Sequence, residues 1–171
     1  MAIVCIGGID RTMRILILQE SPGPAKALQQ SLGSRHELLF VHNEPEAMEV
    51  LASQKVDLII ARVHLEKSNV FDFLKEVKGT ERYRRIPFIC FCGRRTNSAR
   101  ALDSILSRSS KVLGADKYIN VEDFCCGERC DYDKLRIAIE SCLQTDGSVK
   151  IKSANQENAS SHRAPRIFSD S

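Results

Sequence analysis

The chain has 171 residues, of which 43% are hydrophobic and 27% are charged. This is ordinary globular composition, and the length suits one domain with short additional segments, so the sequence excludes a fibrous or wholly disordered protein. The net charge of +3 and the scattered basic residues argue against a nucleic-acid-binding surface, which normally carries a clustered basic stripe.

The apolar runs and the cysteines indicate in which cellular compartment the protein resides. No apolar run approaches the roughly 20 residues of a membrane-spanning helix. Residues 1–12 have an apolar stretch and an early acid but no positively charged leader, so they make a poor signal peptide. The seven cysteines are an odd number, and two of them lie inside an apolar strand, which favours a reducing cytoplasm over a disulfide framework. We therefore predict a soluble cytoplasmic protein with no membrane partner.

Strand and helix patterns alternate along the chain. Short apolar runs predict strands, and apolar residues at helical spacing predict the segments between them to be helices. The expected strands are RILILQ, HELLFVHN, VDLIIAR, IPFICFCG and DKYIN, at 14–19, 36–43, 56–62, 86–93 and 116–120. The expected helices cover 25–32, 44–55, a segment through Phe71, Leu74 and Val77, 97–112 with Leu102, Ile105 and Leu106 on one face, and 132–143.

This alternation predicts an α/β fold: an open five-stranded parallel sheet between two layers of helices. Short right-handed connections leave few topologies, and the flavodoxin-like strand order 2-1-3-4-5 is a common one. In such a sheet, binding sites form at the carboxyl ends of the strands. The residues expected there are Gln19 to Ser21, Arg62 to His64, Cys92 with Gly93, and Ile119 to Glu122.

Composition sets the domain limits. Residues 146–171 are polar and rich in Ser, Asn and Lys, so they cannot bury enough apolar surface to become ordered on their own. We predict an N-terminal extension at 1–12, disordered or forming an added strand, then one domain at 13–145 and a flexible tail at 146–171. Within that tail, 163–168 is a candidate docking segment.

Four segments resemble the receiver domain of two-component response regulators, the CheY-like family. They are RILILQES, VDLIIARVHLEKSNVFDFLKEVK, RRIPFICFCG and LGADKYIN, and they occur in the expected order and spacing. Together they span about three quarters of the chain. LGADKY is the most specific of them, because Gly-Ala-Asp is followed by an aromatic residue on a strand. The resemblance implies the CheY-like form of the flavodoxin-like fold.

The family's chemistry is phosphoryl transfer to a carboxylate, with Mg²⁺ and a lysine neutralising the transferred oxygens. The resemblance assigns the two metal-binding acids to Gln19 and Glu20, the acceptor aspartate to Arg62, the hydroxyl to Cys92 and the lysine to Val121. Four of these five positions are altered. A guanidinium has no lone pair with which to attack phosphorus, and a single carboxylate is a poor Mg²⁺ site. We predict a pseudo-receiver that has no cofactor and is not an enzyme.

Arg62 then needs another role, because a buried guanidinium is costly without a partner. Glu20 is expected at the end of the adjacent strand, so we predict an ion pair in which Arg62 fills the space of the metal and phosphoryl group. The alternative is that the Arg62 side chain extends into solvent and contacts nothing important.

The resemblance implies a function as a protein-interaction module in two-component or phosphorelay-type signalling. Receivers signal through the surface of the fourth helix, fifth strand and fifth helix, where the strand-five aromatic, here Tyr118, moves between exposed and buried positions. That face is also the expected site of homodimerisation. With Cys92 in place of the hydroxyl, the switch is expected to be frozen or driven otherwise. The alternative for Tyr118 is a half-buried core residue.

The cysteines suggest a rival function. Cys125, Cys126 and Cys130 follow strand five, on the same edge of the sheet as Cys92, and could form a zinc or redox site, with His64 as a further ligand. The C-C-x₃-C spacing is not a standard zinc motif, so unconnected thiols are the simpler interpretation. An enzyme of flavodoxin-like fold is disfavoured, because SPGP after strand one lacks the spacing of a phosphate-binding loop.

Overall fold

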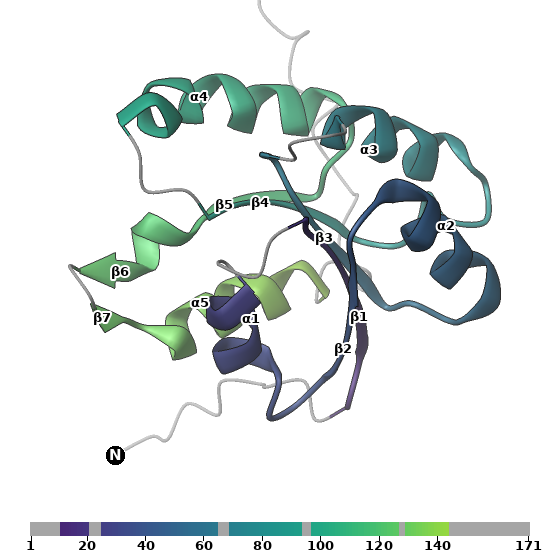
Figure 1. Ribbon diagram of the computed structural model, residues 1–171, viewed down its shortest axis with the longest axis horizontal. Helices are drawn as coiled ribbons and strands as arrows, with labels where there is room; N and C mark the ends of the chain where they lie inside the picture. Colours follow the sequence, from purple (N-terminus) through teal and green to yellow (C-terminus); the bar gives the residue numbers. More distant parts are fainter. Residues whose placement is uncertain (1–10, 21–24, 65–68, 94–96, 127–128, 144–171) are drawn as a thin grey trace, which may run out of the picture.

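The computed structural model describes residues 11–20, 25–64, 69–93, 97–126 and 129–143, with the side chains of 97–100 and 126 left undescribed. Its main sheet has five parallel strands in the order β2-β1-β3-β4-β5, as predicted (Figure 1). The strands are β1 (Arg14–Leu18), β2 (Glu37–Val41), β3 (Leu58–Arg62), β4 (Phe88–Cys92) and β5 (Lys117–Asn120). The tail and nearly all of the N-terminal extension lie outside the described residues.

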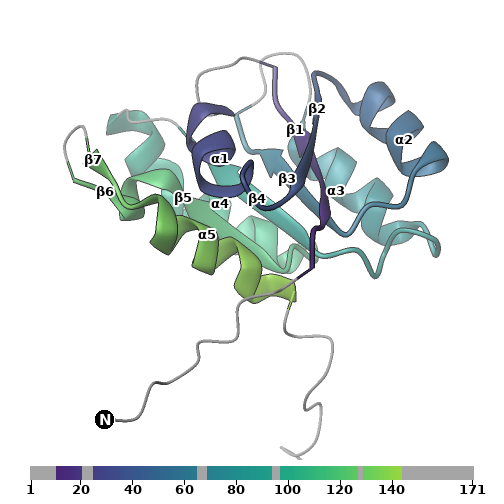
Figure 2. The same ribbon diagram turned by 90° about the horizontal axis from the view of Figure 1, so that it is seen from below.

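Within the described ranges, five α-helices cover the two faces of this sheet. They are α1 (Ala25–Leu32), α2 (Glu44–Ser53), α3 (Val70–Gly79), α4 (Asn97–Val112) and α5 (Tyr132–Glu140). Helices α1 and α5 lie side by side on one face, and α2, α3 and α4 lie on the other (Figures 1 and 2). None of the helices in the described ranges is long and apolar enough to cross a membrane.

The sheet separates two apolar half-cores. Alternate residues of β1 point to opposite faces, so Ile15 and Ile17 pack with α1 and α5 while Leu16 and Leu18 pack with α2 and α3. Every residue of β3 and β4 is buried. The sequences of these strands are therefore almost continuously apolar, because helices cover both faces of the sheet there.

Side chains and turns set the helix ends. The Asn43 carboxamide accepts from the Glu46 N–H at 2.9 Å, and the Glu46 carboxylate accepts from the His42 N–H at 2.9 Å, which forms a reciprocal cap at the start of α2. The turn after α4 contains Gly114 with φ of +97°, a left-handed conformation that glycine adopts without strain.

Helix α4 differs from the simplest expectation for an amphipathic helix. Leu102 is 46% exposed, Ile105 57% and Val112 85%. Ile105 and Val112 lie roughly 160–180° around the helix from Asp103, which faces β5, so this apolar stripe points away from the sheet.

The segment after β5 is more ordered than the predicted loop. It forms a short 3₁₀ helix, η1 (Val121–Phe124), and a small antiparallel hairpin of β6 (Cys125–Cys126) and β7 (Arg129–Cys130). A disulfide joins Cys125 to Cys130. The expectation of unconnected thiols is therefore wrong for this pair, because antiparallel pairing places the two residues directly opposite each other.

Candidate functional site

The carboxyl edge of the sheet gathers the residues at the positions expected for receiver chemistry. Arg62 ends β3 and is paired in register with Phe91 of β4, while Cys92 ends β4 and is paired with Asn120. Leu18 of β1 is paired with Ala61, so Gln19 comes next to Arg62 at the sheet edge. The parallel topology thus brings together positions that are far apart in the sequence.

Arg62 is buried at this edge, with only 8% of its surface exposed. It lines a small pocket together with Gln19, which is 5% exposed, and the walls are the apolar side chains of Ile17, Leu18, Leu28, Ile60 and Phe91. This burial argues against the alternative in which the Arg62 side chain extends into solvent. The side chain is instead enclosed at the carboxyl end of β3, at the position that the resemblance assigns to the acceptor aspartate.

The end of β1 is held by its backbone. The Gln19 N–H donates to the carbonyl of Val41 at 2.9 Å, and a ring nitrogen of His42 lies 3.3 Å from the Gln19 carbonyl oxygen. Glu20, which follows directly, is half-buried. The sheet order therefore places the Glu20 backbone beside the end of β3, while the ion pair between Glu20 and Arg62 stays a prediction.

Val121 occupies the position assigned to the lysine. It is 6% exposed and packs into the α1/α5 half-core. Asn120 caps the 3₁₀ helix that begins at Val121, because its side-chain oxygen accepts from the Glu122 N–H at 3.1 Å. An isopropyl group packed in the core offers no cation to an anionic group at this edge.

Tyr118 and Cys92 meet on the opposite face of the sheet. The Tyr118 hydroxyl donates to Asp103 Oδ1 on α4 at 2.8 Å, and the Asn120 side-chain N–H donates to the same oxygen at 2.9 Å. Burial raises the pKa of Tyr118, and the hydrogen bonds to Asp103 and to the buried Cys92 thiol raise it further. We call the bonded residues Tyr118, Asn120 and Asp103 the α4 latch.

The sequence placed Asn120 at this edge of the sheet, but sequence reasoning missed Asp103 and its contacts with Tyr118 and Asn120. Asp103 lies on the helix face that meets β5, but it is 15 residues from Tyr118 and 17 from Asn120 in sequence, so no local pattern links them. Asp103 also acts on the electrostatics of η1. Partial burial raises the pKa of Asp123, and the negative charges of Asp103 and Glu122 raise it further.

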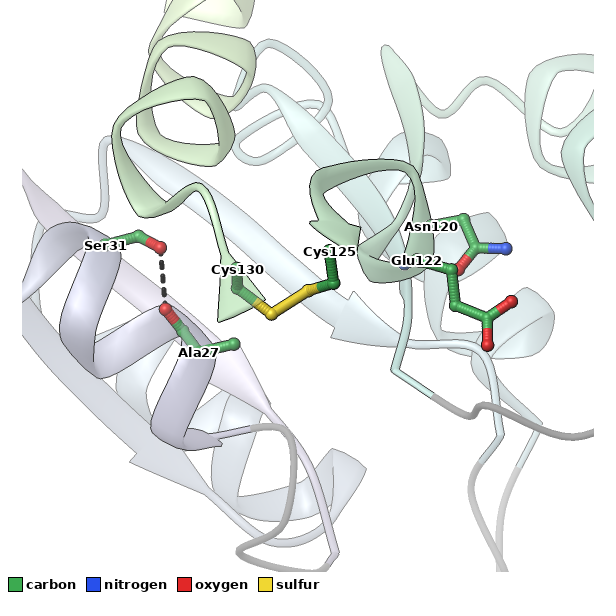
Figure 3. Close-up of a disulfide and its surroundings, with 6 residues drawn as sticks. All are labelled: Ala27, Ser31, Asn120, Glu122, Cys125 and Cys130. Atoms are coloured by element: carbon green, nitrogen blue, oxygen red, sulfur yellow. Dashed lines mark hydrogen bonds between the residues drawn. A yellow bond between two sulfur atoms is a disulfide. The ribbon is translucent and has the colours of Figure 1, made fainter. Parts of the chain in front are cut away.

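The predicted thiol cluster is only partly assembled. Cys125 and Cys130 form the disulfide drawn in Figure 3, beside α1, which contributes Ala27 and Ser31. Cys92 belongs to the interior of the sheet, and the side chain of Cys126 lies outside the described residues. Within the described ranges, no group of three or more His, Cys, Asp and Glu side chains could hold a metal ion.

Solved structures share this arrangement. The signal receiver domain of a histidine kinase from Syntrophus aciditrophicus matches with a TM-score of 0.59 at 23% identity, over 84% of this chain and all of that chain. The chemotaxis response regulator CheY4 of Vibrio cholerae matches with a TM-score of 0.59 at 16% identity, over 78% of this chain and all of that chain. The chain has the fold of a response regulator receiver domain.

A third receiver domain, from an HD domain-containing protein of Pseudomonas fluorescens, matches with a TM-score of 0.58 at 22% identity, over 78% of this chain and 96% of that chain. No protein-family model matches the sequence, and no curated protein matches it. The likeness therefore concerns the receiver fold, while the chemistry depends on the residues at the sheet edge.

Proposed function

We propose that the protein is a phosphorylation-independent receiver domain that acts as a protein-interaction module in signal transduction. The observation that carries this proposal is the buried Arg62 at the end of β3. Arginine stays protonated and cannot act as a nucleophile toward phosphorus. Its positive charge also opposes a divalent cation at the same place.

The other residues of the edge support the same proposal. Gln19 is uncharged and Val121 is packed in the apolar core, so neither supplies the charge that phosphoryl transfer needs. We infer that the domain is not an enzyme and that its role in the cytoplasm is recognition. Exposed apolar side chains on α4 and α5 support that inference, because large apolar side chains at a surface favour protein contacts.

The α4 latch supports an interaction surface that is held in one arrangement. Tyr118 is tied to α4 through Asp103, and Asn120 links the same carboxylate to the start of η1. We propose that the surface of α4, β5 and α5 binds a protein of the signalling pathway, or a second copy of the chain, without waiting for phosphorylation.

Two measurements test the loss of phosphotransfer. Incubation with acetyl phosphate and Mg²⁺, followed by intact mass spectrometry, should show no added phosphoryl group. Beryllofluoride with Mg²⁺ should leave the amide spectrum unchanged around Gln19, Arg62 and Cys92. A phosphorylatable receiver treated in parallel is the control. An added phosphoryl group, or clear shifts at these residues, would contradict the proposal.

The interaction role is tested with surface variants. The variants replace Ile137 on α5 or Ile105 on α4, which are 46% and 57% exposed, with a charged residue. Each variant should lose a partner that is recovered with the full chain, or should dissociate dimers that light scattering detects. Ser104→Asp, at an exposed position on α4, is the matched control. A partner that binds all of these variants equally well would place the interaction elsewhere.

A further inference from the structure

The Cys125–Cys130 disulfide closes a short hairpin between η1 and α5. Strands β6 and β7 have two residues each, and the two cysteines are cross-strand partners. Two-stranded hairpins are marginal in water even when their strands are longer. The covalent bond therefore adds a direct constraint on the conformation of this segment.

The hairpin connects two helix ends. Cys125 is the residue at which η1 ends, and Cys130 directly precedes Asp131, the cap of α5. The Asp131 carboxylate accepts from the Lys134 N–H at 3.0 Å, while the Asp131 N–H donates to the Phe124 carbonyl at 2.8 Å. The first turn of α5 is thus tied to η1 across the base of the disulfide-closed loop.

The two bonded sulfurs also belong to the most accessible cysteines whose side chains are described. Cys125 and Cys130 are half-buried, whereas Cys90, Cys92 and Cys142 are buried thiols. Burial raises the pKa of Cys90 to about 11 and also raises that of Cys142. Thiol–disulfide exchange needs a thiolate and access to solvent, so these interior thiols are protected from it.

We propose that the Cys125–Cys130 disulfide is a reversible redox switch that controls the order of η1 and the first turn of α5. A glutathione thiolate attacks one sulfur and forms a mixed disulfide, while the other sulfur leaves as a thiolate and takes up a proton. A second glutathione thiolate attacks the mixed disulfide. The products are two protein thiols and one glutathione disulfide, and the two electrons come from the glutathione pair.

Reduction of the disulfide weakens the neighbouring backbone hydrogen bond between Asp131 and Phe124. Once the cross-link is gone, the hairpin no longer holds Phe124 against Asp131, so η1 and the first turn of α5 loosen together. Because Asn120 caps the start of η1, the change extends to a residue of the α4 latch. The proposal concerns the chemistry of the disulfide and stands independently of any partner.

The experiment uses the full chain purified without reductant and equilibrated in buffers of varied glutathione to glutathione-disulfide ratio. Alkylation and peptide mapping should show a reversible transition that adds two labels, at Cys125 and Cys130, with a midpoint inside the range of these buffers. Hydrogen exchange should rise on reduction in residues 121–135 and stay unchanged in β1, β3 and β4.

Two variants keep the result interpretable. The double variant Cys125→Ser and Cys130→Ser should show the exchange pattern of the reduced protein in every buffer, whereas Cys126→Ser should keep the full transition. A pair that stays oxidised in millimolar glutathione, reduction that leaves exchange in 121–135 unchanged, or loss of the transition in Cys126→Ser would each overturn the proposal.

Discussion

Arg62 places a positive charge in a buried environment at the end of β3. It is 8% exposed, and its pocket has walls made of apolar side chains. Desolvating a charge of this kind costs several kcal/mol unless another charged group compensates. The half-buried Glu20, at the end of the adjacent strand, is the carboxylate that we expect to do so.

Replacement of Arg62 by alanine tests the predicted ion pair. Removing one partner of a buried pair leaves the other charge uncompensated, so Arg62→Ala should lower the free energy of unfolding by roughly 3–5 kcal/mol. Chemical unfolding measures this difference. Arg82→Ala, at an exposed position, is the control and should change stability by less than about 1 kcal/mol. A variant that melts with the parent would mean that Arg62 pairs with nothing of consequence.

Replacement of Arg62 by aspartate should make stability depend on Mg²⁺. Without metal, the new carboxylate beside Glu20 is repelled by a like charge. With metal, the two carboxylates can share a divalent ion, so Arg62→Asp should regain melting temperature as millimolar Mg²⁺ is added, whereas the parent should not respond. Arg62→Asn separates the effect of charge from that of size. Equal responses of the aspartate and asparagine variants would refute a rebuilt metal site.

At the scale of elements, α5 is anchored at the amino edge of the sheet by a buried polar cluster. Glu140 is 4% exposed, its Oε2 accepts from Arg136 at 3.2 Å, and its Oε1 lies 3.1 Å from His36 Nε2. The Met13 N–H donates to His36 Nδ1 at 3.4 Å, so Nε2 carries the proton that is donated to Glu140. The cluster therefore joins the end of α5 to the starts of β1 and β2.

Glu140→Ala should cost about 3 kcal/mol of unfolding free energy, because it leaves the buried His36 donor without its acceptor and Arg136 without a buried partner. Asp133→Ala removes the other carboxylate that binds Arg136, at 3.1 Å, but this side chain is 86% exposed. It should therefore cost less than about 1 kcal/mol. Equal losses in the two variants, measured by urea unfolding, would show that burial does not decide the energetics of this cluster.

The acidic start of η1 predicts a pH dependence. The pKa of Asp123 is raised in the folded protein, so the native state binds its proton more tightly than the unfolded chain does. The stability that the protonated Asp123 carboxyl contributes is present below its pKa in the unfolded chain, about 3.9. It is lost as pH rises through the higher pKa of the folded protein. Asp123→Asn should therefore raise the melting temperature at pH 7, with the difference shrinking toward pH 4.

The size of that effect should be small, about 1–2 °C, because Asp123 is only partly desolvated and solvent screens the charges around it. Glu49→Gln, at an exposed position of α2, removes a negative charge of the same kind and serves as the control. A difference for Asp123→Asn that is the same at pH 4 and pH 7 would rule out titration of this carboxyl as its cause.

At the scale of the whole molecule, the two half-cores share a single sheet. Leu74 of α3 belongs to one and Leu135 of α5 to the other, and both are fully buried. Since each strand contributes to both half-cores, neither can be lost without exposing the sheet that supports the other. Unfolding should therefore be a single cooperative transition.

Leu74→Ala and Leu135→Ala should each lower the free energy of unfolding by about 2–5 kcal/mol, as large-to-small core substitutions do. In both variants, far-UV circular dichroism and tyrosine fluorescence should report coincident transitions. Val112→Ala, at a position that is 85% exposed, is the control. Two separate transitions in either core variant would mean that the half-cores unfold independently.

The sequence was enough to predict the architecture, because the signals for it are local. Apolar runs of strand length, helical spacing and capping residues lie within a few residues of one another, and their alternation leaves few topologies. It also determined that Arg62, Gln19 and Val121 come to the ends of strands.

Which of these side chains meet, and which are buried, depends on how the elements pack in three dimensions. Asp103 joins Tyr118 and Asn120 across more than a dozen residues, and Glu140 meets His36 across 104 residues. Such contacts depend on how elements pack, for which the sequence carries no local pattern. The Cys125–Cys130 disulfide is intermediate between a local sequence signal and a long-range contact. Its cysteines are close in sequence, but which thiols pair depends on the register of β6 against β7. Backbone hydrogen bonding between these two strands sets that register.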